Sequence, residues 1–314
     1  MPRISVIICT HNRADMLVSA LESQGVQSLD RSLYEVIVVD NGSTDGTPAV
    51  VKNYQSRLQM PTTVLVREDQ LGLAFARNTG FRHAQGEYVA FMDDDARADK
   101  DWLRLAMEYF ERIKPVPYGV GGPILPVYEA RKPAWFKDEY EIRTWGDVPR
   151  FLKRGESFSG SNMIFRRQIL EAFGGFDVRV GMSGNYISVG EETELFNRMW
   201  KCGGEDSCLY YSPDLRMFHA VPKMKMTIAY QLKRAFVEGQ SRYLQSEPSS
   251  RRGRWELLMR SFVSIAKQSG SAVTHLGECR TCQNWIIERA GPIAAEVGRF
   301  MGCLGLSIPL RQRP

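Results

Sequence analysis

The first half of the chain alternates short apolar runs with stretches of helical periodicity, and this alternation restricts the fold more than any other feature. The runs are rich in β-branched residues and show no polar alternation. Such strands are covered on both faces, as in a mostly parallel sheet between helices, so the pattern predicts an α/β fold. The expected strands lie at Ile4–Cys9, Glu35–Val39, Thr63–Val66 and Tyr88–Met92, with helices from about Ala14, after Thr47 and from about Leu71.

Polar or small residues follow three of these strands at the point where each strand ends. They are Thr10-His11-Asn12-Arg13, Asp40-Asn41-Gly42-Ser43 and Asp93-Asp94-Asp95. In open parallel sheets, ligands bind outside the carboxyl ends of the strands. We therefore expect the three loops to converge on one crevice.

The third loop consists of three adjacent carboxylates, which repel one another unless a cation or solvent compensates their charge. Neighbouring residues of an extended segment point in opposite directions, so Asp93 and Asp95 share one face while Asp94 points elsewhere. The triple thus predicts a divalent metal site. A solvated acidic loop is the alternative.

The segments around these loops resemble those of the family 2 glycosyltransferases, which are inverting enzymes with a GT-A fold. The matching segments are Ser5–Arg13, Glu35–Asp45, Gly72 with Ala76–Gly80, Tyr88–Asp95, Gly174–Asp177 and Gly190–Leu195. The resemblance covers roughly residues 3–222 and implies a Rossmann-like, GT-A type domain that binds a nucleotide sugar. We expect its donor half at about 1–126 and its acceptor half at about 127–222.

The resemblance also implies how the donor is held. Thr10, His11, Asn12 and Arg13, together with Asp40, would hold the base and ribose of a nucleotide sugar, with a UDP-sugar favoured. Asp93 would contact the ribose or sugar, with Asp94 the least essential of the three aspartates, and Asp95 would coordinate Mn²⁺ or Mg²⁺. The cation neutralises the charge that builds on the leaving diphosphate.

A carboxylate should accept the proton that the acceptor hydroxyl loses as it attacks. Where family members carry Asp after Glu, this chain has Glu191-Glu192, so Glu192 is the position-matched base and Glu191 stays open. At a helix start both could instead be favourable dipole partners. Arg77 either adds to the diphosphate clamp or forms a surface ion pair. His219, on the apolar segment Leu215–Val221, is either a third metal ligand or a core histidine.

Three residues are candidates for acceptor contacts. The segment Val127–Glu156 has no sustained periodicity and is expected to form a loop-rich excursion over the crevice, where Trp135 and Trp145 would be acceptor platforms or loop anchors. Asn162, just before the next expected strand, is the third.

Charge divides the chain near residue 222. Residues 1–222 carry 26 Lys+Arg and 30 Asp+Glu, whereas 223–314 carry 15 and 6, so the body is −4 and the tail +9. From Thr227 the pattern is helical. The helical, basic region 223–314 interleaves cations with apolar residues, which predicts contact with an anionic membrane and a lipid-linked acceptor; a helical cap or a homo-oligomer surface is the alternative. The basic residues on which this prediction rests are Lys223, Lys225, Lys233, Arg234, Arg251, Arg252 and Arg254.

The N-terminus, the apolar runs and the cysteines indicate where in the cell the protein is located. The apolar run at the N-terminus is too short for a signal peptide, and no run approaches eighteen apolar residues. The cysteines are interpreted as reduced thiols, and Cys279 and Cys282 with His275 make only an incidental zinc motif. We expect a cytoplasmic protein, with a peripheral place at the inner face of the plasma membrane as the alternative, and no nucleic-acid partner.

The loop after the first strand excludes two other nucleotide enzymes. A nicotinamide-binding Rossmann enzyme and a sugar nucleotidyltransferase both need a glycine-rich loop where this chain has Thr-His-Asn-Arg. The prediction is therefore an inverting, metal-dependent glycosyltransferase that acts on a glycan or lipid-linked acceptor. An inactive homologue that serves as a binding or scaffolding module is the alternative, because Glu192 stands where Asp is usual.

Overall fold

The computed structural model describes residues 1–57, 60–179, 190–202, 209–246, 251–274, 281–304 and 306. His275 and Cys279, part of the predicted incidental zinc motif, lie outside the described residues, as do the side chains of Arg251, Arg252 and Arg254. The chain divides into two compact units. The first comprises Met1–Val127, Glu141–Val178 and Glu191–Ala220, and the second comprises Tyr128–Tyr140, Arg179–Gly190 and Val221–Pro314. The division into units differs from the predicted domains, because Tyr128–Tyr140 belongs to the second unit. The domain boundary near residue 222 therefore stays a prediction.

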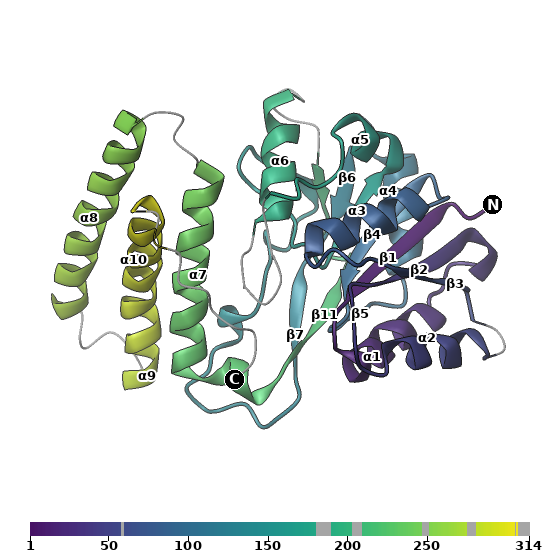
Figure 1. Cartoon of the computed structure of the whole chain (residues 1–314), viewed down its shortest axis with the longest axis horizontal. Helices are drawn as coiled ribbons and strands as arrows, with labels where there is room; N and C mark the ends of the chain where they lie inside the picture. Colours follow the sequence, from purple (N-terminus) through teal and green to yellow (C-terminus); the bar gives the residue numbers. More distant parts are fainter. Residues whose placement is uncertain are drawn as a thin grey trace. The chain divides into compact units, whose positions relative to one another are not determined.

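An eight-stranded sheet forms the centre of the first unit, in the order β3-β2-β1-β4-β9-β6-β10-β8. Figure 1 labels its strands β1 to β4 and β6. The first four strands in this order are mutually parallel, while β9 is antiparallel to both β4 and β6, and β8 is antiparallel to β10. The strands are β1 Ile4–Thr10, β2 Tyr34–Asp40, β3 Thr62–Arg67, β4 Tyr88–Asp93, β6 Gly119–Gly121, β8 Arg150–Phe151, β9 Met163–Arg166 and β10 Leu209–Tyr211.

Helices cover both faces of this sheet, which explains why its central strands lack polar alternation. Ile4, Val6 and Ile8 pack with α1 (Ala14–Gly25), α2 (Thr47–Gln55) and α4 (Trp102–Arg112). Ile7 points to the opposite face and packs with α3 (Leu73–His83), α5 (Arg167–Ala172) and α6 (Glu191–Cys202). Every residue of β2 is buried. The two cores hold the sheet rigid up to the ends of its strands.

A second, three-stranded sheet has the order β5-β11-β7, from β5 (Ala96–Ala98), β11 (Met217–Val221) and β7 (Ile124–Tyr128). β5 begins directly after the three aspartates. β11 runs antiparallel to β5, with His219 opposite Ala96. This pairing brings a histidine from far along the chain beside Asp95.

The second unit is helical. Its described helices are α7 Ile228–Ser246, α8 Arg251–Thr274, the short α9 Cys282–Trp285 with a π-helical turn at Ile286–Ala290, and α10 Gly291–Cys303. α10 packs against both α7 and α8, beside which it lies in Figure 1. A small core of Phe136, Val221 and Met226 joins the segment Tyr128–Tyr140 to this unit. Among the described residues, no helix has both the length and the apolarity that crossing a membrane requires.

Candidate functional site

The strand register brings three loops to one edge of the large sheet. Thr10 pairs with Asp40 across β1 and β2, and Cys9 pairs with Asp93 across β1 and β4. These three parallel strands therefore end level with one another. The polar segments that follow them leave the sheet side by side, at the edge where parallel sheets bind ligands.

Hydrogen bonds join the first two loops. His11 Nδ1 lies 2.7 Å from the Asn41 carbonyl oxygen, and the Asn12 side chain accepts a 2.8 Å hydrogen bond from the backbone N–H of Thr44. Asn12 has a φ of +53°, a left-handed conformation that asparagine tolerates better than most residues. These bonds hold the first two loops in a fixed arrangement.

Asp40 is buried at the base of the second loop. Its Oδ1 accepts a 2.8 Å hydrogen bond from Ser43 N–H, and its Oδ2 lies 3.3 Å from Arg67 Nη1. The carboxylate thus caps its own loop, and its contact with a nucleotide base stays a prediction.

Asp94 ties the third loop to the first. Its carboxylate accepts hydrogen bonds from Thr10 Oγ1 at 2.8 Å and from Arg13 Nη1 at 3.0 Å, and the residue is buried. Burial raises the pKa of Asp94 to about 6, while the positive charge of Arg13 opposes that rise. Asp94, Thr10 and Arg13 therefore brace the two loops against each other.

Asp93, Asp95 and His219 form what we call the metal-ligand cluster. One ligand atom from each lies within 4.8 Å of the others. His219 Nε2 is 2.9 Å from Asp95 Oδ1, and Arg13 Nη1 is 3.6 Å from Asp95 Oδ2. All three residues are partly exposed. Two carboxylates and an imidazole that converge in this way fit a divalent cation.

Arg77 on α3 joins the metal-ligand cluster to the predicted bases. Its Nη2 lies 3.5 Å from Asp93 Oδ1, and its Nη1 lies 3.0 Å from Glu191 Oε1 and 3.8 Å from Glu192 Oε2. Arg77 is only 3% exposed and stacks over Phe176. A buried guanidinium thus compensates three carboxylates, and we call these four charged residues the charge cluster.

The two glutamates of the charge cluster differ in environment. Burial and the neighbouring charge of Glu192 raise the pKa of Glu191 to about 7, against the opposing effect of Arg77. The Oε2 atom of Glu191 is buried and has no hydrogen-bond partner among the described residues. The Glu192 side chain, in contrast, is 24% exposed. Of the two glutamates, Glu192 is the one with a solvent-accessible carboxylate.

Sequence analysis missed Gly160, which makes room for Arg77. A Cβ on Gly160 would collide with the guanidinium of Arg77. The sequence signal for this close approach was the lone glycine within Ser159–Asn162. Its partner could not be named, because residues 77 and 160 are far apart in the sequence.

The three acceptor candidates have different surroundings. Asn162 is wholly buried: its amide donates to the carbonyls of Pro123 and Leu215 at 3.1 and 2.7 Å and accepts from Trp102 Nε1 at 2.9 Å. Asn162 therefore braces the segments around it, and its contact with an acceptor stays a prediction.

The two tryptophans belong to different units. Trp145, in the first unit, is 41% exposed and donates to the Ser157 carbonyl at 2.7 Å. Trp135, in the second unit, packs edge-on against Phe136. Trp145 is the more exposed of the two, whereas Trp135 packs against a small core, and the platform role stays a prediction for both.

Known proteins are similar to this chain in sequence. A family model described as "Glycosyl transferase family 2" matches residues 5–174. A glucosyl-dolichyl phosphate glucuronosyltransferase of Haloferax volcanii is 26% identical over 76% of either chain. The succinoglycan biosynthesis protein ExoM of Rhizobium meliloti is 27% identical over 82% of this chain and 80% of its own.

Solved structures share the fold. The mannosyltransferase PcManGT from Pyrobaculum calidifontis, in complex with GDP-Man and Mn²⁺, has a TM-score of 0.63 at 24% identity and covers 95% of this chain and 87% of its own. S. aureus TarS 1-349 with UDP-GlcNAc has a TM-score of 0.57 at 15% identity and covers 98% and 93%. The predicted family resemblance and the predicted GT-A fold, with its mostly parallel sheet and C-terminal helices, are confirmed.

Proposed function

The chain belongs to glycosyl transferase family 2, and we propose that it is an inverting, metal-dependent enzyme that transfers a sugar from a nucleotide sugar to a glycan or lipid-linked acceptor. The observation that carries this proposal is the metal-ligand cluster of Asp93, Asp95 and His219, at the edge where β4 ends. The acceptor class is supported by two relatives, one named for glucosyl-dolichyl phosphate and the other for succinoglycan biosynthesis.

The donor atoms of the metal-ligand cluster favour Mn²⁺ over Mg²⁺. Mg²⁺ prefers oxygen ligands, whereas an imidazole nitrogen such as that of His219 is a better ligand for transition metals, the class to which Mn²⁺ belongs. A cation held by Asp95, Asp93 and His219 would neutralise the negative charge that develops on the leaving diphosphate. The solved mannosyltransferase with the same fold was determined with Mn²⁺.

Donor binding is proposed for the loop Thr10 to Arg13, with Asp40 beneath it and Arg77 beside the sugar. These loops are already braced through Asp94 and Asn12, so binding would cost little ordering of the backbone. The two solved neighbours were determined with GDP-Man and UDP-GlcNAc, which shows that this fold accepts either base. A UDP-sugar is the first donor to test.

Glu192 is proposed as the base that accepts the proton of the acceptor hydroxyl. Its carboxylate is 24% exposed and lies 3.8 Å from Arg77 Nη1, so an acceptor hydroxyl could reach it beside the charge cluster. Glu191 is buried against Arg77 at 3.0 Å and would position the guanidinium. Glu192→Gln should abolish transfer and leave donor binding intact. If Glu191→Gln does this instead, Glu191 is the base.

The test of function is nucleotide release from a panel of UDP- and GDP-sugars with Mn²⁺. Asp95→Ala should lower the rate about 10²–10³-fold, because it removes a charge-stabilising ligand. The matched control is Asp30→Ala, which removes an exposed carboxylate just before β2, at the opposite end of that strand from Asp40, and should keep full activity.

Two results would contradict the proposal. One is a rate that neither a chelator nor Asp95→Ala lowers. The other is a parent protein that binds donors but neither hydrolyses nor transfers them to any acceptor, which would favour the inactive binding or scaffolding module.

A further inference from the structure

Helix α8 presents its large apolar side chains to the outside. Trp255, Met259 and Phe262 are 64%, 53% and 59% exposed, and Val263 is exposed beside them. Their spacing of four and three residues places Trp255, Met259 and Phe262 on one face of the helix. We call these three residues the apolar stripe.

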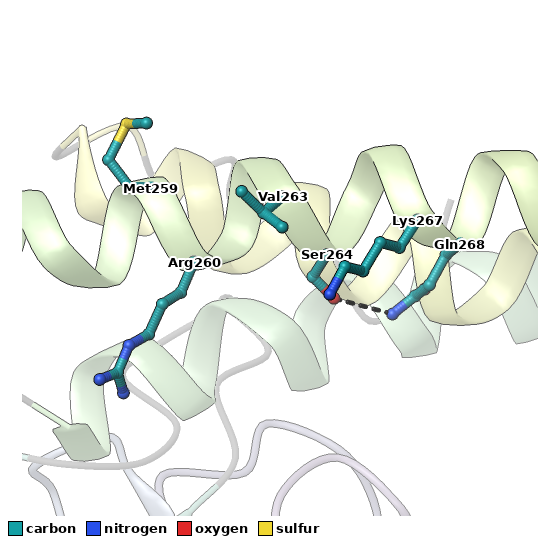
Figure 2. A pocket seen from close by; sticks show the side chains of 6 residues that line it. All are labelled: Met259, Arg260, Val263, Ser264, Lys267 and Gln268. Carbon is teal, nitrogen blue, oxygen red and sulfur yellow. Dashed lines mark hydrogen bonds between the residues drawn. The ribbon is translucent and has the colours of Figure 1, made fainter.

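The other side of α8 mixes half-buried Leu257, Leu258 and Ile265 with polar side chains. Ser261 is wholly buried, and its Oγ has no hydrogen-bond partner among the described residues. Gln268 donates to Ser264 Oγ at 3.0 Å, but its own buried Oε1 lacks a partner in the same described part of the chain (Figure 2). A helix that faces water normally turns its large apolar side chains inward and its polar side chains outward, because burying an unpaired polar group costs free energy. The outer face of α8 is thus suited to a medium less polar than water.

Positive charge lies beside the apolar stripe. Arg260 and Lys267 are exposed, and with Met259 and Val263 they line an open hollow of about 560 Å³ on α8 (Figure 2). The segment 223–314 as a whole carries 15 Lys+Arg against 6 Asp+Glu. Cations that flank apolar side chains match an anionic bilayer, whose phosphates lie directly above the hydrocarbon.

The same charge argues against a second copy of the chain as the occupant of this face. Self-association through α8 would bring Arg260 and Lys267 of each copy toward a surface with the same charge. Opposed like charges weaken association unless acidic residues intervene. Within the described side chains of α8, Glu256 is the single acidic residue.

We propose that α8 docks on an anionic lipid bilayer. The apolar stripe enters the boundary between headgroups and acyl chains, and Arg260 and Lys267 contact lipid phosphates. This interaction stands on the second unit alone and does not depend on the proposed transferase chemistry. It would hold the chain at the surface where lipid-linked molecules reside.

Partition onto vesicles tests the proposal. The parent should co-sediment with vesicles of equal parts phosphatidylcholine and phosphatidylglycerol, and much less with phosphatidylcholine alone. Met259→Ser with Phe262→Ser should lower the partition coefficient roughly tenfold or more, through lost apolar burial. Arg260→Gln with Lys267→Gln should lower it about fivefold per charge. Val26→Ser, which removes a 65% exposed apolar residue from the first unit, should change nothing.

A spectroscopic test identifies the docking face directly. Vesicles should shift the parent's tryptophan fluorescence to the blue. Trp255→Phe should remove that shift and keep most of the partition, because phenylalanine still enters the boundary. Persistence of the shift in Trp255→Phe would mean that another tryptophan enters the lipid, and would overturn the assignment.

Two further outcomes would overturn the proposal. One is equal partition of the parent and the Met259→Ser, Phe262→Ser variant. The other is a parent that ignores vesicles and forms a dimer by light scattering, which the same variant dissociates, because α8 would then be an interface between copies. Nucleotide release from donors should be unchanged in all α8 variants, so failure here leaves the catalytic proposal standing.

Discussion

The charge cluster of the first unit and helix α8 of the second differ in the side chains that they bury and expose. In the first unit the buried Arg77 lies within 3.8 Å of three carboxylates, and the buried Asp94 accepts hydrogen bonds from Thr10 and Arg13. In the second, α8 exposes Phe262 and buries Ser261, whose Oγ has no hydrogen-bond partner in the part of the chain that the structure describes. The first unit buries charge where compensating groups surround it. The second keeps apolar area outside.

This difference separates two kinds of functional surface. A crevice that handles a charged diphosphate needs fixed charges in a partly dry site, which only a rigid scaffold can hold. A docking face needs apolar area that stays outside, which lowers its contribution to folding. The stability of the first unit should therefore depend on its polar residues, whereas the outward residues of α8 should be dispensable for folding.

Arg77→Gln should have the largest effect, because it removes the cation of the charge cluster. Glu191, Glu192 and Asp93 would be left without their compensating charge, and breaking a buried ion pair in this way costs about 3–5 kcal/mol. The measurement is the free energy of unfolding in denaturant. A loss of this size would show that the first unit depends on a polar contact.

The pH dependence of this loss has a definite sign. Burial and Glu192 raise the pKa of Glu191 to about 7, and Arg77 opposes them, so the contribution of Arg77 through this pair requires an ionised Glu191. That contribution is present above pH 7 and is lost as the pH falls through the pKa. The difference between the parent and Arg77→Gln should therefore shrink below pH 7.

The control for Arg77 is Arg112, on α4, whose side chain is 77% exposed and lies 3.7 Å from Glu108. Arg112→Gln should change the free energy of unfolding by no more than about 0.5 kcal/mol at any pH. Equal effects of the two substitutions would mean that the charge cluster has no special role in stability.

The sequence predicted the central strands well, because a strand buried on both faces is a continuous run of apolar residues. The expected Ile4–Cys9 and Glu35–Val39 are one or two residues shorter than β1 and β2, and the loops that follow them meet as the parallel-sheet rule requires. Local composition determines such strands.

Contacts between distant segments could not be predicted in this way. His219 reaches Asp95 because β11 pairs with β5, and nothing in either short strand specifies the other. Arg77 was given two roles from the sequence, clamp or surface ion pair. Its spacing of three from Ala74 and from Gly80, both small and buried, would have favoured an inward side chain. The outward apolar face of α8 depends on its packing with α10, which no local pattern encodes.

Glycine contacts between α7 and α10 provide a prediction of intermediate size. A Cβ on Gly298 would collide with the backbone carbonyl of Phe236 on α7, whereas a Cβ on Gly291 would meet nothing within 4 Å. Gly298→Ala should lower the stability of the second unit by about 1–3 kcal/mol, because the helices must move apart. Gly291→Ala should be neutral or stabilising by up to about 1 kcal/mol. Thermal unfolding followed by circular dichroism measures both. If the two variants match, α7 and α10 are not held by close backbone contact.

The smallest expected effect is that of Phe262→Ala in the second unit, for which Phe91 in the first unit is the buried comparison. Phe91 lies inside the first unit, 1% exposed, and Phe91→Ala should cost about 3–5 kcal/mol through lost burial and a cavity. Phe262 is 59% exposed, so Phe262→Ala should change the free energy of unfolding by no more than about 0.5 kcal/mol in buffer. Repeating both measurements with anionic vesicles should leave the Phe91→Ala difference unchanged and increase that of Phe262→Ala, because only the parent's Phe262 gains apolar contact with lipid. A large cost of Phe262→Ala in plain buffer would mean that this residue is buried in the protein, and the contrast between the two units would then fail.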